Sequence, residues 1–371
     1  MKKELWIEAL RFPMAFLVVW IHCFVPHIEW DTVRLSDGLS GDELYCILGK
    51  LFSITICSAA VPLFMFISGY LLFKNVQNSY LPIWGGQIRK RIKTLLLPYI
   101  LWISIYILYA NRGLPIAGIA DVAKMYWCSE SLPKVSMFGN SFFHYYPFLV
   151  PMWFIRNLIV FVVISPCLFW LLKSTDNNKI GKRAVVFLVI VCLLDITRAL
   201  SMPLYLSSWK SLLFFSLGVF VQINRINLQT LLAKLSHKFY FLILGVLLLA
   251  MLFGCNSTRT GNLFLNIFTL LEVALLMKIA INSKFSLWVA NAHCFGIKLS
   301  DMTFFIFAFH IFVLHYVSDY LSRFLQCIDL NHGIAILDYM LSPIFCVMAC
   351  ICVYCALKKT IPSVLHILTG R

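Results

Sequence analysis

Long apolar runs separated by short polar segments are the dominant pattern of this chain. A membrane-crossing helix needs about 20 apolar residues, and these runs are continuous, unlike the alternating strands of outer-membrane barrels. The pattern therefore predicts an all-α integral membrane protein, a bundle of about ten transmembrane helices. The predicted spans, the fifth and sixth of them short, cover residues 6–25, 48–73, 94–111, 147–172, 184–197, 208–223, 239–255, 262–282, 303–322 and 336–357.

Positive charges between the runs predict how these helices are oriented. Ten spans place both termini on one side of the membrane. Twenty of the 31 Lys and Arg residues fall on that side and nine on the other. Because Lys and Arg accumulate in cytoplasmic loops, both termini are expected in the cytoplasm. The net charge of +15 would suggest a nucleic-acid partner in a soluble protein, but here it reflects topology and no nucleic acid is expected.

Composition agrees with a single membrane domain. Hydrophobic residues fill 61% of the 371 positions and charged residues 13%, where a soluble domain has about 25% charged residues. We expect one domain over residues 1–371, with its core at about 5–358 and no fused soluble domain. The 13 cysteines mostly lie inside apolar runs and show no zinc-type spacing. They are expected to pack as small apolar residues, and no metal is expected.

Several ionisable residues lie inside the predicted spans. Such residues are costly in a bilayer and usually mark a functional site that faces the bundle interior. The alternative for each is a structural hydrogen bond between helices, which for the isolated Glu272 is equally favoured. The residues are Glu8, Arg11, His22, Arg156, Glu272, His310 and His315, with Asp195 near a span end.

Arg11 and His22 are predicted to share one face of the first helix. Eleven residues at 100° each make three turns plus about 20°, and the rise separates the two residues by about 16 Å. Glu8, three residues before Arg11, can pair with it on that face. One helix face thus presents an anion-binding group near its cytoplasmic end and a base near its outer end. A histidine with an ordinary pKa near 6.5 can take a proton from a hydroxyl at neutral pH.

This geometry suits a long ligand with an anionic head and a reactive tip, which is the form of a coenzyme A thioester. Its phosphates need cations on the cytosolic side, and QIRKRIKTLLLPY at residues 87–99 places four of them at the cytoplasmic mouth of the third span. Arg binds phosphate through two hydrogen bonds and Lys acts as a point charge. The alternative is that these charges only hold the loop inside. The candidate phosphate-binding residues are Arg89, Lys90, Arg91 and Lys93.

Five motifs in order resemble the membrane-bound acyltransferase family 3, the prokaryotic carbohydrate O-acyltransferases. The first helix carries the family's pattern of an arginine, ten residues and a histidine, here Arg11 and His22 preceded by Glu8. The resemblance covers most of the chain, although the spacing of Arg91 and Lys93 differs from the family's paired arginines. The other motifs are VPLFMFISGYLLF (61–73), RKRIKTLLLPY (89–99), PMWFIRNLIV (151–160) and TFFIFAFHIF (303–312).

The resemblance implies a transfer of an acyl group, by default acetyl, from cytosolic acyl-CoA to a hydroxyl of an extracytoplasmic or lipid-linked carbohydrate. It implies a multi-pass protein of the bacterial inner membrane that modifies a cell-envelope polysaccharide. By similarity His22 is the catalytic histidine, acting as a base or as a covalent acyl relay, with Arg11 as its paired arginine. Glu8 is the expected partner of Arg11 in the catalytic group, and the basic run contributes to coenzyme A binding. The residues expected near substrate or cavity are Ser68, Trp153, Arg156 and His310, and Ser68, Arg156 or a backbone amide would stabilise the oxyanion.

The sequence is also compatible with other functions and with other roles for single residues. A transporter or flippase for a glycan or small anion would also carry intramembrane charges, but would more often show paired segments broken by Gly or Pro. A sensor or structural protein would not need the Arg11–His22 face. His310 either orients His22, lines the cavity or forms an interhelical hydrogen bond, and His315, about 140° round the helix, is expected to be structural. Aromatic residues at 112–146 form either an interfacial belt or a sugar-stacking platform.

Overall fold

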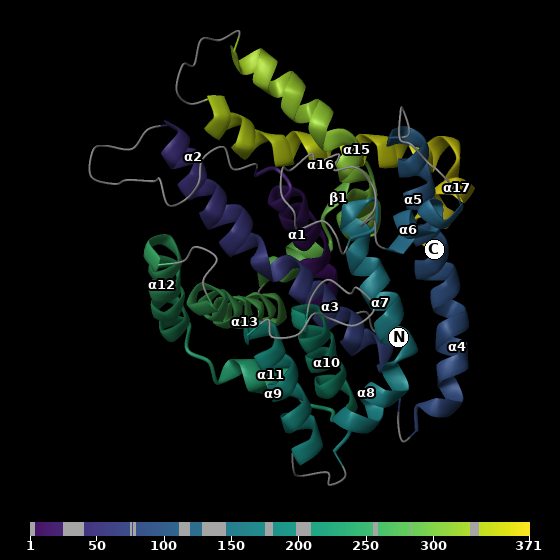
Figure 1. The fold of residues 1–371 in the computed structure, drawn as a ribbon, viewed down its shortest axis with the longest axis vertical. Coiled ribbons are helices and arrows are strands. Elements are labelled where there is room, and N and C mark those ends of the chain that lie inside the picture. The colour runs from purple at the N-terminus through teal and green to yellow at the C-terminus, as the bar shows by residue number, and fades with distance from the viewer. Residues whose placement is uncertain are drawn as a thin grey trace. The chain divides into compact units, whose positions relative to one another are not determined.

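The computed structural model consists almost entirely of helices, in agreement with the predicted fold class (Figure 1). Its short strands β1 (His293–Cys294) and β2 (Ile297–Lys298) form an antiparallel hairpin. Contacts between residues divide the chain into two compact units. The structure describes residues 4–24, 41–74, 76, 79–110, 119–127, 146–174, 181–197, 209–254, 259–282, 284–326 and 334–371.

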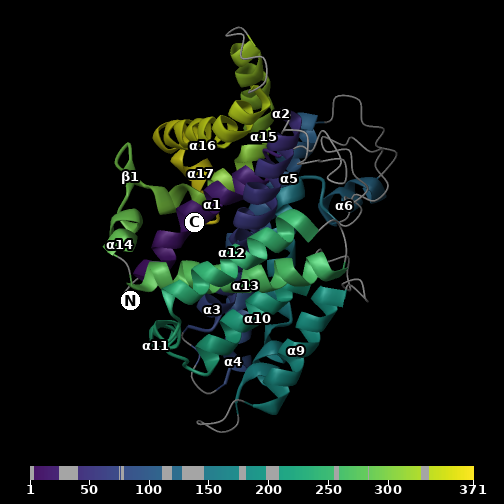
Figure 2. The ribbon, with the colours of Figure 1, turned by 90° about the vertical axis from the view of Figure 1, so that its left-hand side faces the viewer.

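Unit 1 comprises residues 1–64 and 227–356 and is built around α1 (Leu5–Ile21). Its further helices are α2 (Gly41–Gly49), η2 (Lys50–Thr55), η3 (Ile56–Ala59), the start of α3 (Ala60–Leu72), α11 (Leu228–Ala233), α12 (His237–Gly254), α13 (Arg259–Asn282), α14 (Lys284–Ala290), α15 (Leu299–Gln326) and most of α16 (Ile334–Thr360). Because the buried apolar positions of α1 lie on more than one side, it packs against α13, α14 and α15. The helices α12 and α13 lie side by side (Figure 2).

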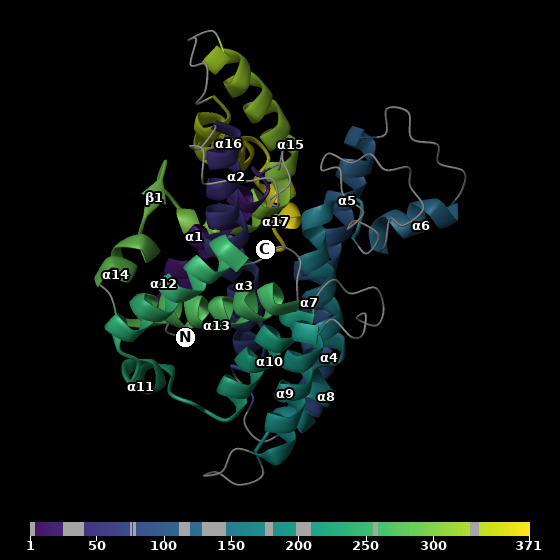
Figure 3. The ribbon, with the colours of Figure 1, turned by 60° about the vertical axis from the view of Figure 1, so that its left-hand side comes forward.

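Unit 2 comprises residues 65–226 and 357–371. Its elements are the rest of α3, α4 (Leu81–Arg91), η4 (Ile92–Leu96), α5 (Leu97–Ala110), α6 (Ile119–Trp127), η6 (Val150–Met152), α7 (Trp153–Val163), α8 (Ser165–Leu172), α9 (Lys182–Thr197), α10 (Trp209–Ile223) and α17 (Pro362–Leu368). The helices α8, α9 and α10 pack together (Figure 3). The C-terminal α17 packs on α5, where Trp102 Nε1 donates to the Leu368 carbonyl oxygen at 2.9 Å.

Within the described residues, five helices are long and apolar enough to cross a membrane. A sixth span results if α7 and α8 are counted as one bent span. Every predicted run contains a helix, but α1, α9, α10 and α12 are not among the five. The helices support a multi-pass membrane protein, whereas the ten-span topology and cytoplasmic termini stay predictions. The five are Gly41–Leu72, Leu81–Ala110, Leu263–Ile281, Leu299–Gln326 and Ile334–Thr360.

Two predicted spans are interrupted. The run at 147–172 is not one straight helix, because α7 and α8 meet at an angle of 66°. Pro166 lies in the first turn of α8 and has no N–H to continue the hydrogen bonds of α7. The run at 48–73 begins earlier, at Gly41, and changes to a π-helix in η2 and a 3₁₀-helix in η3 before α3 continues. Such insertions often occur at functional sites.

The third predicted span is part of a longer helix that begins before the basic run. The helix begins at Leu81, not near residue 94, so residues 89–93 lie within it. Pro82 in the first turn suits a helix start, and Arg and Lys are good helix formers. Nothing from there to Ala110 ends the helix, although it becomes π-helical in η4.

Candidate functional site

The predicted site residues divide between the two units. In unit 1 lie Glu8, Arg11, His22 and His310. In unit 2 lie Ser68, Arg89, Lys90, Arg91, Lys93, Trp153 and Arg156.

His22 and His310 lie beside each other in unit 1. Their ring centroids are 5.2 Å apart and the rings are tilted by 36°. His22 is the residue that follows the last turn of α1, and His310 lies inside α15 with no exposed surface. Because α1 packs against α15, the fold brings together two imidazoles that are far apart in the sequence.

Hydrogen bonds define the tautomer of His310. Its Nδ1 lies 2.8 Å from the carbonyl oxygen of Phe307 and 3.1 Å from that of Ile306. Carbonyl oxygens only accept, so Nδ1 carries the proton and Nε2 presents a lone pair. This Nε2 is buried and has no hydrogen-bond partner among the described residues. The His22 ring lies next to this nitrogen's ring, 5.2 Å between centroids, but makes no hydrogen bond to it in the structure.

The backbone just before His22 is held by two residues that the sequence did not indicate. Ser53 Oγ donates to the Trp20 carbonyl oxygen at 3.0 Å and lies 2.9 Å from the Tyr339 hydroxyl. Both Ser53 and Tyr339 are buried. The Trp20 ring stacks on Phe52 at 5.2 Å with 4° between the planes. These contacts fix the end of α1 and with it the position of His22.

A carboxylate near this cluster was also missed. Asp338 accepts hydrogen bonds from Ser318 Oγ and Ser342 Oγ, both at 2.8 Å. It precedes Tyr339 and lies inside the predicted span 336–357. The criterion that selected Glu272, an ionisable residue inside a predicted span, therefore also applies to Asp338. The bond from Ser318 links α15 to α16, and the bond from Ser342 lies within α16, which is a structural role.

The predicted pairing of Glu8 and Arg11 is present in α1. Arg11 Nη1 lies 3.2 Å from Glu8 Oε1, and Ser300 Oγ donates to Glu8 Oε2 at 2.9 Å. The Arg11 side chain is 35% exposed and that of Glu8 12%. Glu8 therefore ties the guanidinium to both α1 and α15, while part of Arg11 stays accessible to an anion.

Two of the ionisable residues inside predicted spans, Glu272 and His315, have contacts that suit a structural role. Glu272 is buried in α13 and accepts a hydrogen bond of 3.4 Å from Ser58 Oγ, which links α13 to η3. His315 is exposed on α15, with its ring 5.9 Å from that of Tyr316. Both residues fit the structural alternative.

The side chains of the basic run in α4 and η4 differ in exposure. Arg89, Lys90 and Lys93 are exposed, whereas Arg91 is partly buried. Trp84 Nε1 donates to the Val162 carbonyl oxygen at 3.3 Å, which marks the side of α4 that faces α7. Arg91 follows Trp84 by two helical turns and shares that side. The exposed cations can bind phosphate, and Arg91 is turned toward α7.

Arg156 is fully buried in α7 and ties that helix to α6. Its Nη1 donates to the Trp127 carbonyl oxygen, and its guanidinium carbon lies 5.6 Å from the centre of the Trp127 ring. Trp153 meets Tyr146 edge-on at 6.2 Å, and Ser68 is half-buried in α3. The other aromatic residues considered for a sugar platform lie outside the described residues, namely Phe138, Phe142, Phe143, His144 and Tyr145.

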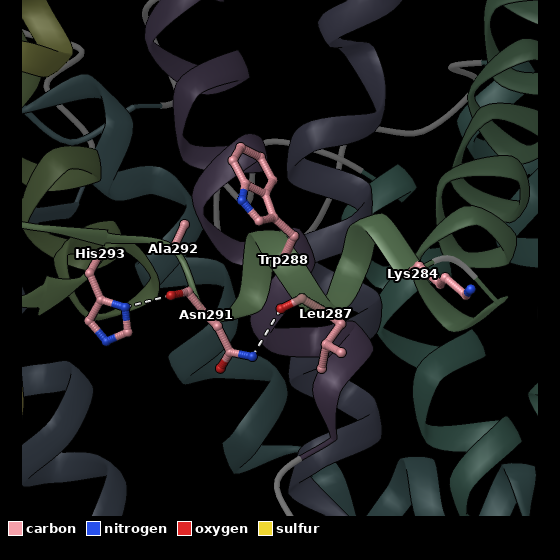
Figure 4. A pocket seen from close by; sticks show the side chains of 6 residues that line it. All are labelled: Lys284, Leu287, Trp288, Asn291, Ala292 and His293. Carbon is pink, nitrogen blue, oxygen red and sulfur yellow. Dashed lines mark hydrogen bonds between the residues drawn. The ribbon is translucent and has the colours of Figure 1, made fainter.

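A shallow pocket lies along α14 in unit 1 (Figure 4). Asn291 Nδ2 donates to the Leu287 carbonyl oxygen at 3.0 Å, and His293 Nδ1 donates to the carbonyl oxygen of Asn291. Trp288 is 69% exposed, and an exposed Trp beside Lys is typical of a membrane interface. None of the predicted site residues lines this pocket, whose lining is Lys284, Leu287, Trp288, Asn291, Ala292 and His293.

Comparisons with known proteins bear on the chemistry. A family model described as an acyltransferase domain matches residues 4–358. The succinoglycan biosynthesis protein ExoH of Rhizobium meliloti (strain 1021) is 24% identical over 235 residues, 61% of this chain and 55% of that protein. The inner membrane protein YcfT of Escherichia coli (strain K12) is 34% identical over 94 residues, 24% of each chain. No solved structure matches the chain.

The chain thus spans about half the length of the first of these relatives and a quarter of the second. The family match is broader, since it includes both units and all five motifs. Because that match covers nearly the whole sequence, this protein belongs to the family 3 acyltransferases.

Proposed function

We propose that this protein is an integral-membrane O-acyltransferase. It transfers an acyl group, by default acetyl, from cytosolic acyl-CoA to a hydroxyl of an extracytoplasmic or lipid-linked carbohydrate. The observation that carries the proposal is the contact between His22 and His310, 5.2 Å between centroids, in a chain of the acyltransferase family. The name of ExoH, a protein of succinoglycan biosynthesis, supports a glycan as the acceptor, and that of YcfT supports the inner membrane.

His22 acts as the general base in the proposed reaction. It removes the proton from the acceptor hydroxyl, and the hydroxyl oxygen attacks the thioester carbonyl carbon. The tetrahedral intermediate collapses as the carbon–sulfur bond breaks, and the departing thiolate takes the proton back from His22. The developing oxyanion needs a hydrogen-bond donor, for which Ser68, Arg156 and a backbone amide are the candidates. In the variant mechanism His22 carries the acyl group covalently between donor and acceptor.

The tautomer of His310 suits a positioning role for this base. We propose that its Nε2, which has no hydrogen-bond partner among the described residues, accepts the N–H of His22 during the reaction, which leaves the other His22 nitrogen unprotonated for the acceptor hydroxyl. The buried bond between Ser53 and Tyr339 holds the backbone at Trp20 and limits the positions open to His22. Preorganisation of this kind is what general-base catalysis requires.

Arg11 and the exposed cations of α4 and η4 are proposed to bind the anionic part of the donor. Arg11 is oriented by Glu8 and remains partly exposed. Arg89, Lys90 and Lys93 are exposed on their helix, where phosphates can reach them. Loss of Arg11 is expected to weaken the use of acyl-CoA and leave the protein folded.

The test is release of free thiol from acetyl-CoA by the purified protein, with and without candidate sugars. His22→Ala is expected to lower kcat by about 10² to 10⁴, the usual contribution of a general base. His315→Ala is the matched control, because His315 is exposed on α15, and it should keep wild-type activity. Near-wild-type turnover in folded His22→Ala would remove both versions of the mechanism.

The same assay separates the alternative function. A transporter or flippase releases no thiol from acetyl-CoA and instead moves labelled substrate across vesicle membranes. Comparison of surface-glycan acylation in cells with and without the protein, by mass spectrometry, then identifies the acceptor. Unchanged acylation in cells that lack the protein would exclude a glycan acceptor.

A further inference from the structure

The side-chain amide of Asn157 in α7 is buried without hydrogen-bond partners among the described residues. It is fully buried, and neither its oxygen nor its nitrogen has a partner among the described residues. Buried polar groups are nearly always bonded, and an exception calls for a bound water or ligand. Phe154, Leu158 and Phe161 of the same helix are buried too, so the surroundings are apolar. The site therefore suits a partner that offers both a donor and an acceptor.

Two further unpartnered atoms lie on the helix packed against α7. Both α4 and η4 contact α7. On them, Arg91 Nε and Thr94 Oγ1 are buried and have no hydrogen-bond partner in the part of the chain that the structure describes. Arg91 shares the side of α4 on which Trp84 bonds to Val162 of α7. Polar atoms without partners therefore occur on both helices of this packed pair.

Three of the four charges of the basic run are exposed, and the fourth, Arg91, belongs to the buried groups. Arg89, Lys90 and Lys93 are exposed and suit phosphates, which need cations. Asn157 and Thr94 are uncharged and suit a neutral, narrow chain with hydrogen-bonding groups along it. The pantetheine arm of coenzyme A has this chemistry, because amide and hydroxyl groups are spaced along a thin chain that ends in the phosphates.

We propose that Asn157, with Arg91 and Thr94, binds the amide groups of the pantetheine arm of acyl-CoA. The assignment rests on the proposed function, because it supposes an acyl-CoA donor. Asn157 Nδ2 donates to a pantetheine carbonyl oxygen, and its Oδ1 accepts from a pantetheine N–H. Arg91 Nε and Thr94 Oγ1 bond other polar groups of the arm. A sugar hydroxyl could make similar bonds, so a sugar is the competing ligand.

Asn157→Leu is the decisive variant, because leucine has the same number and branching of side-chain heavy atoms and no polar group. Without ligand, the variant should melt at the wild-type temperature or above it, since replacing unpartnered polar atoms by an apolar group of similar shape is neutral or stabilising. With pantetheine as the probe, its Kd should rise by about tenfold to a hundredfold, because the variant loses both hydrogen bonds of the amide. Binding of adenosine 3′,5′-bisphosphate, which lacks the arm, should not change.

The matched control is Asn224→Leu at a bonded asparagine of the same unit. Asn224 Nδ2 donates to the carbonyl oxygens of Leu172 and Phe220, and its Oδ1 accepts from the Ser174 N–H. This variant should melt at a lower temperature and bind pantetheine as the wild type does. The control therefore separates a loss of stability from a loss of binding.

Three results would overturn the assignment. In the first, Asn157→Leu binds pantetheine as tightly as the wild type. In the second, the variant instead loses the binding of a hexose from a panel of simple sugars, which makes the site an acceptor site. In the third, the wild type binds neither coenzyme A nor pantetheine and cleaves no acetyl-CoA, and then the proposed function fails together with this assignment. The first two results leave the proposed function intact.

Discussion

Two glycines let α3 and α10 approach closely within unit 2. A Cβ atom added at Gly69 would lie 2.1 Å from the carbonyl oxygen of Phe215, and one added at Gly218 would lie 2.0 Å from that of Phe66. Small residues at such crossings are typical of membrane helices, because close backbone packing stabilises their association. We therefore predict that Gly69→Ala and Gly218→Ala each destabilise unit 2.

The expected loss follows from the geometry. The obstructing atoms belong to the backbone and cannot rotate away, so the two helices must separate by about 1 Å to restore normal packing. Overpacking costs about 1–3 kcal/mol, and the upper end applies where two rigid helices must shift. Alanine regains about 1 kcal/mol through its helix propensity, which leaves a net loss of about 2 kcal/mol. At 2–4 °C per kcal/mol, the melting temperature should fall by about 4–8 °C.

The assay is thermal melting of the purified protein in detergent, followed by size-exclusion chromatography. Gly85→Ala and Gly245→Ala are the matched controls, because an added Cβ meets nothing within 4 Å at either position. These helical controls should melt at the wild-type temperature or slightly above it. If Gly69→Ala and Gly218→Ala melt together with the controls, the close crossing of α3 and α10 does not contribute to stability and the reasoning fails.

Three shorter predictions concern the site. His310→Gln should keep more activity than His310→Asn, because only the longer amide can place an acceptor where Nε2 lies. In the asparagine variant kcat should fall about tenfold or more, whereas the control His315→Asn should behave as wild type. Equal losses of kcat in both His310 variants would contradict the positioning role. Tyr339→Phe removes the hydroxyl that bonds Ser53, and should cost about 1 kcal/mol in a thermal melt and lower kcat with the KM for acetyl-CoA unchanged. The KM for acetyl-CoA should rise between 0.05 and about 0.5 M salt, because exposed cations are screened; a KM independent of salt would exclude them from binding.

Hydropathy locates the helices of this protein but not their interruptions. The predicted run at 262–282 corresponds to the span Leu263–Ile281, and that at 336–357 lies within Ile334–Thr360, because long apolar runs leave few alternatives to a helix. The π-helical η2 changes only which backbone groups pair and leaves no mark in hydropathy. The basic run was read as a loop because of its charge, yet its residues are good helix formers and continue the helix Leu81–Ala110.

Spacing predicts contacts within one helix and not between helices. Glu8 and Arg11 are three residues apart, and their ion pair follows from helical geometry. The contact of His22 with His310 depends on which helices pack together, and the sequence left several roles open for His310. Asn157 sits inside the motif PMWFIRNLIV, but a polar residue in a motif does not show that its amide lacks a partner. Only the three-dimensional arrangement separates it from a bonded asparagine such as Asn224.

The distribution of satisfied and unsatisfied polar groups ties the two units to different parts of the reaction. Around His22, the bonds of Ser53, Tyr339 and Asp338 are made within unit 1, as expected for groups that hold the proposed base in place. Among the buried polar atoms without a hydrogen-bond partner in the described residues are His310 Nε2 in unit 1 and the amide of Asn157 in unit 2. A buried polar atom without a partner costs stability, so its retention is best explained where a proton or a ligand completes it during the reaction. On this argument unit 1 holds the proposed base and Arg11, and unit 2 holds the groups proposed to bind the pantetheine arm of the donor.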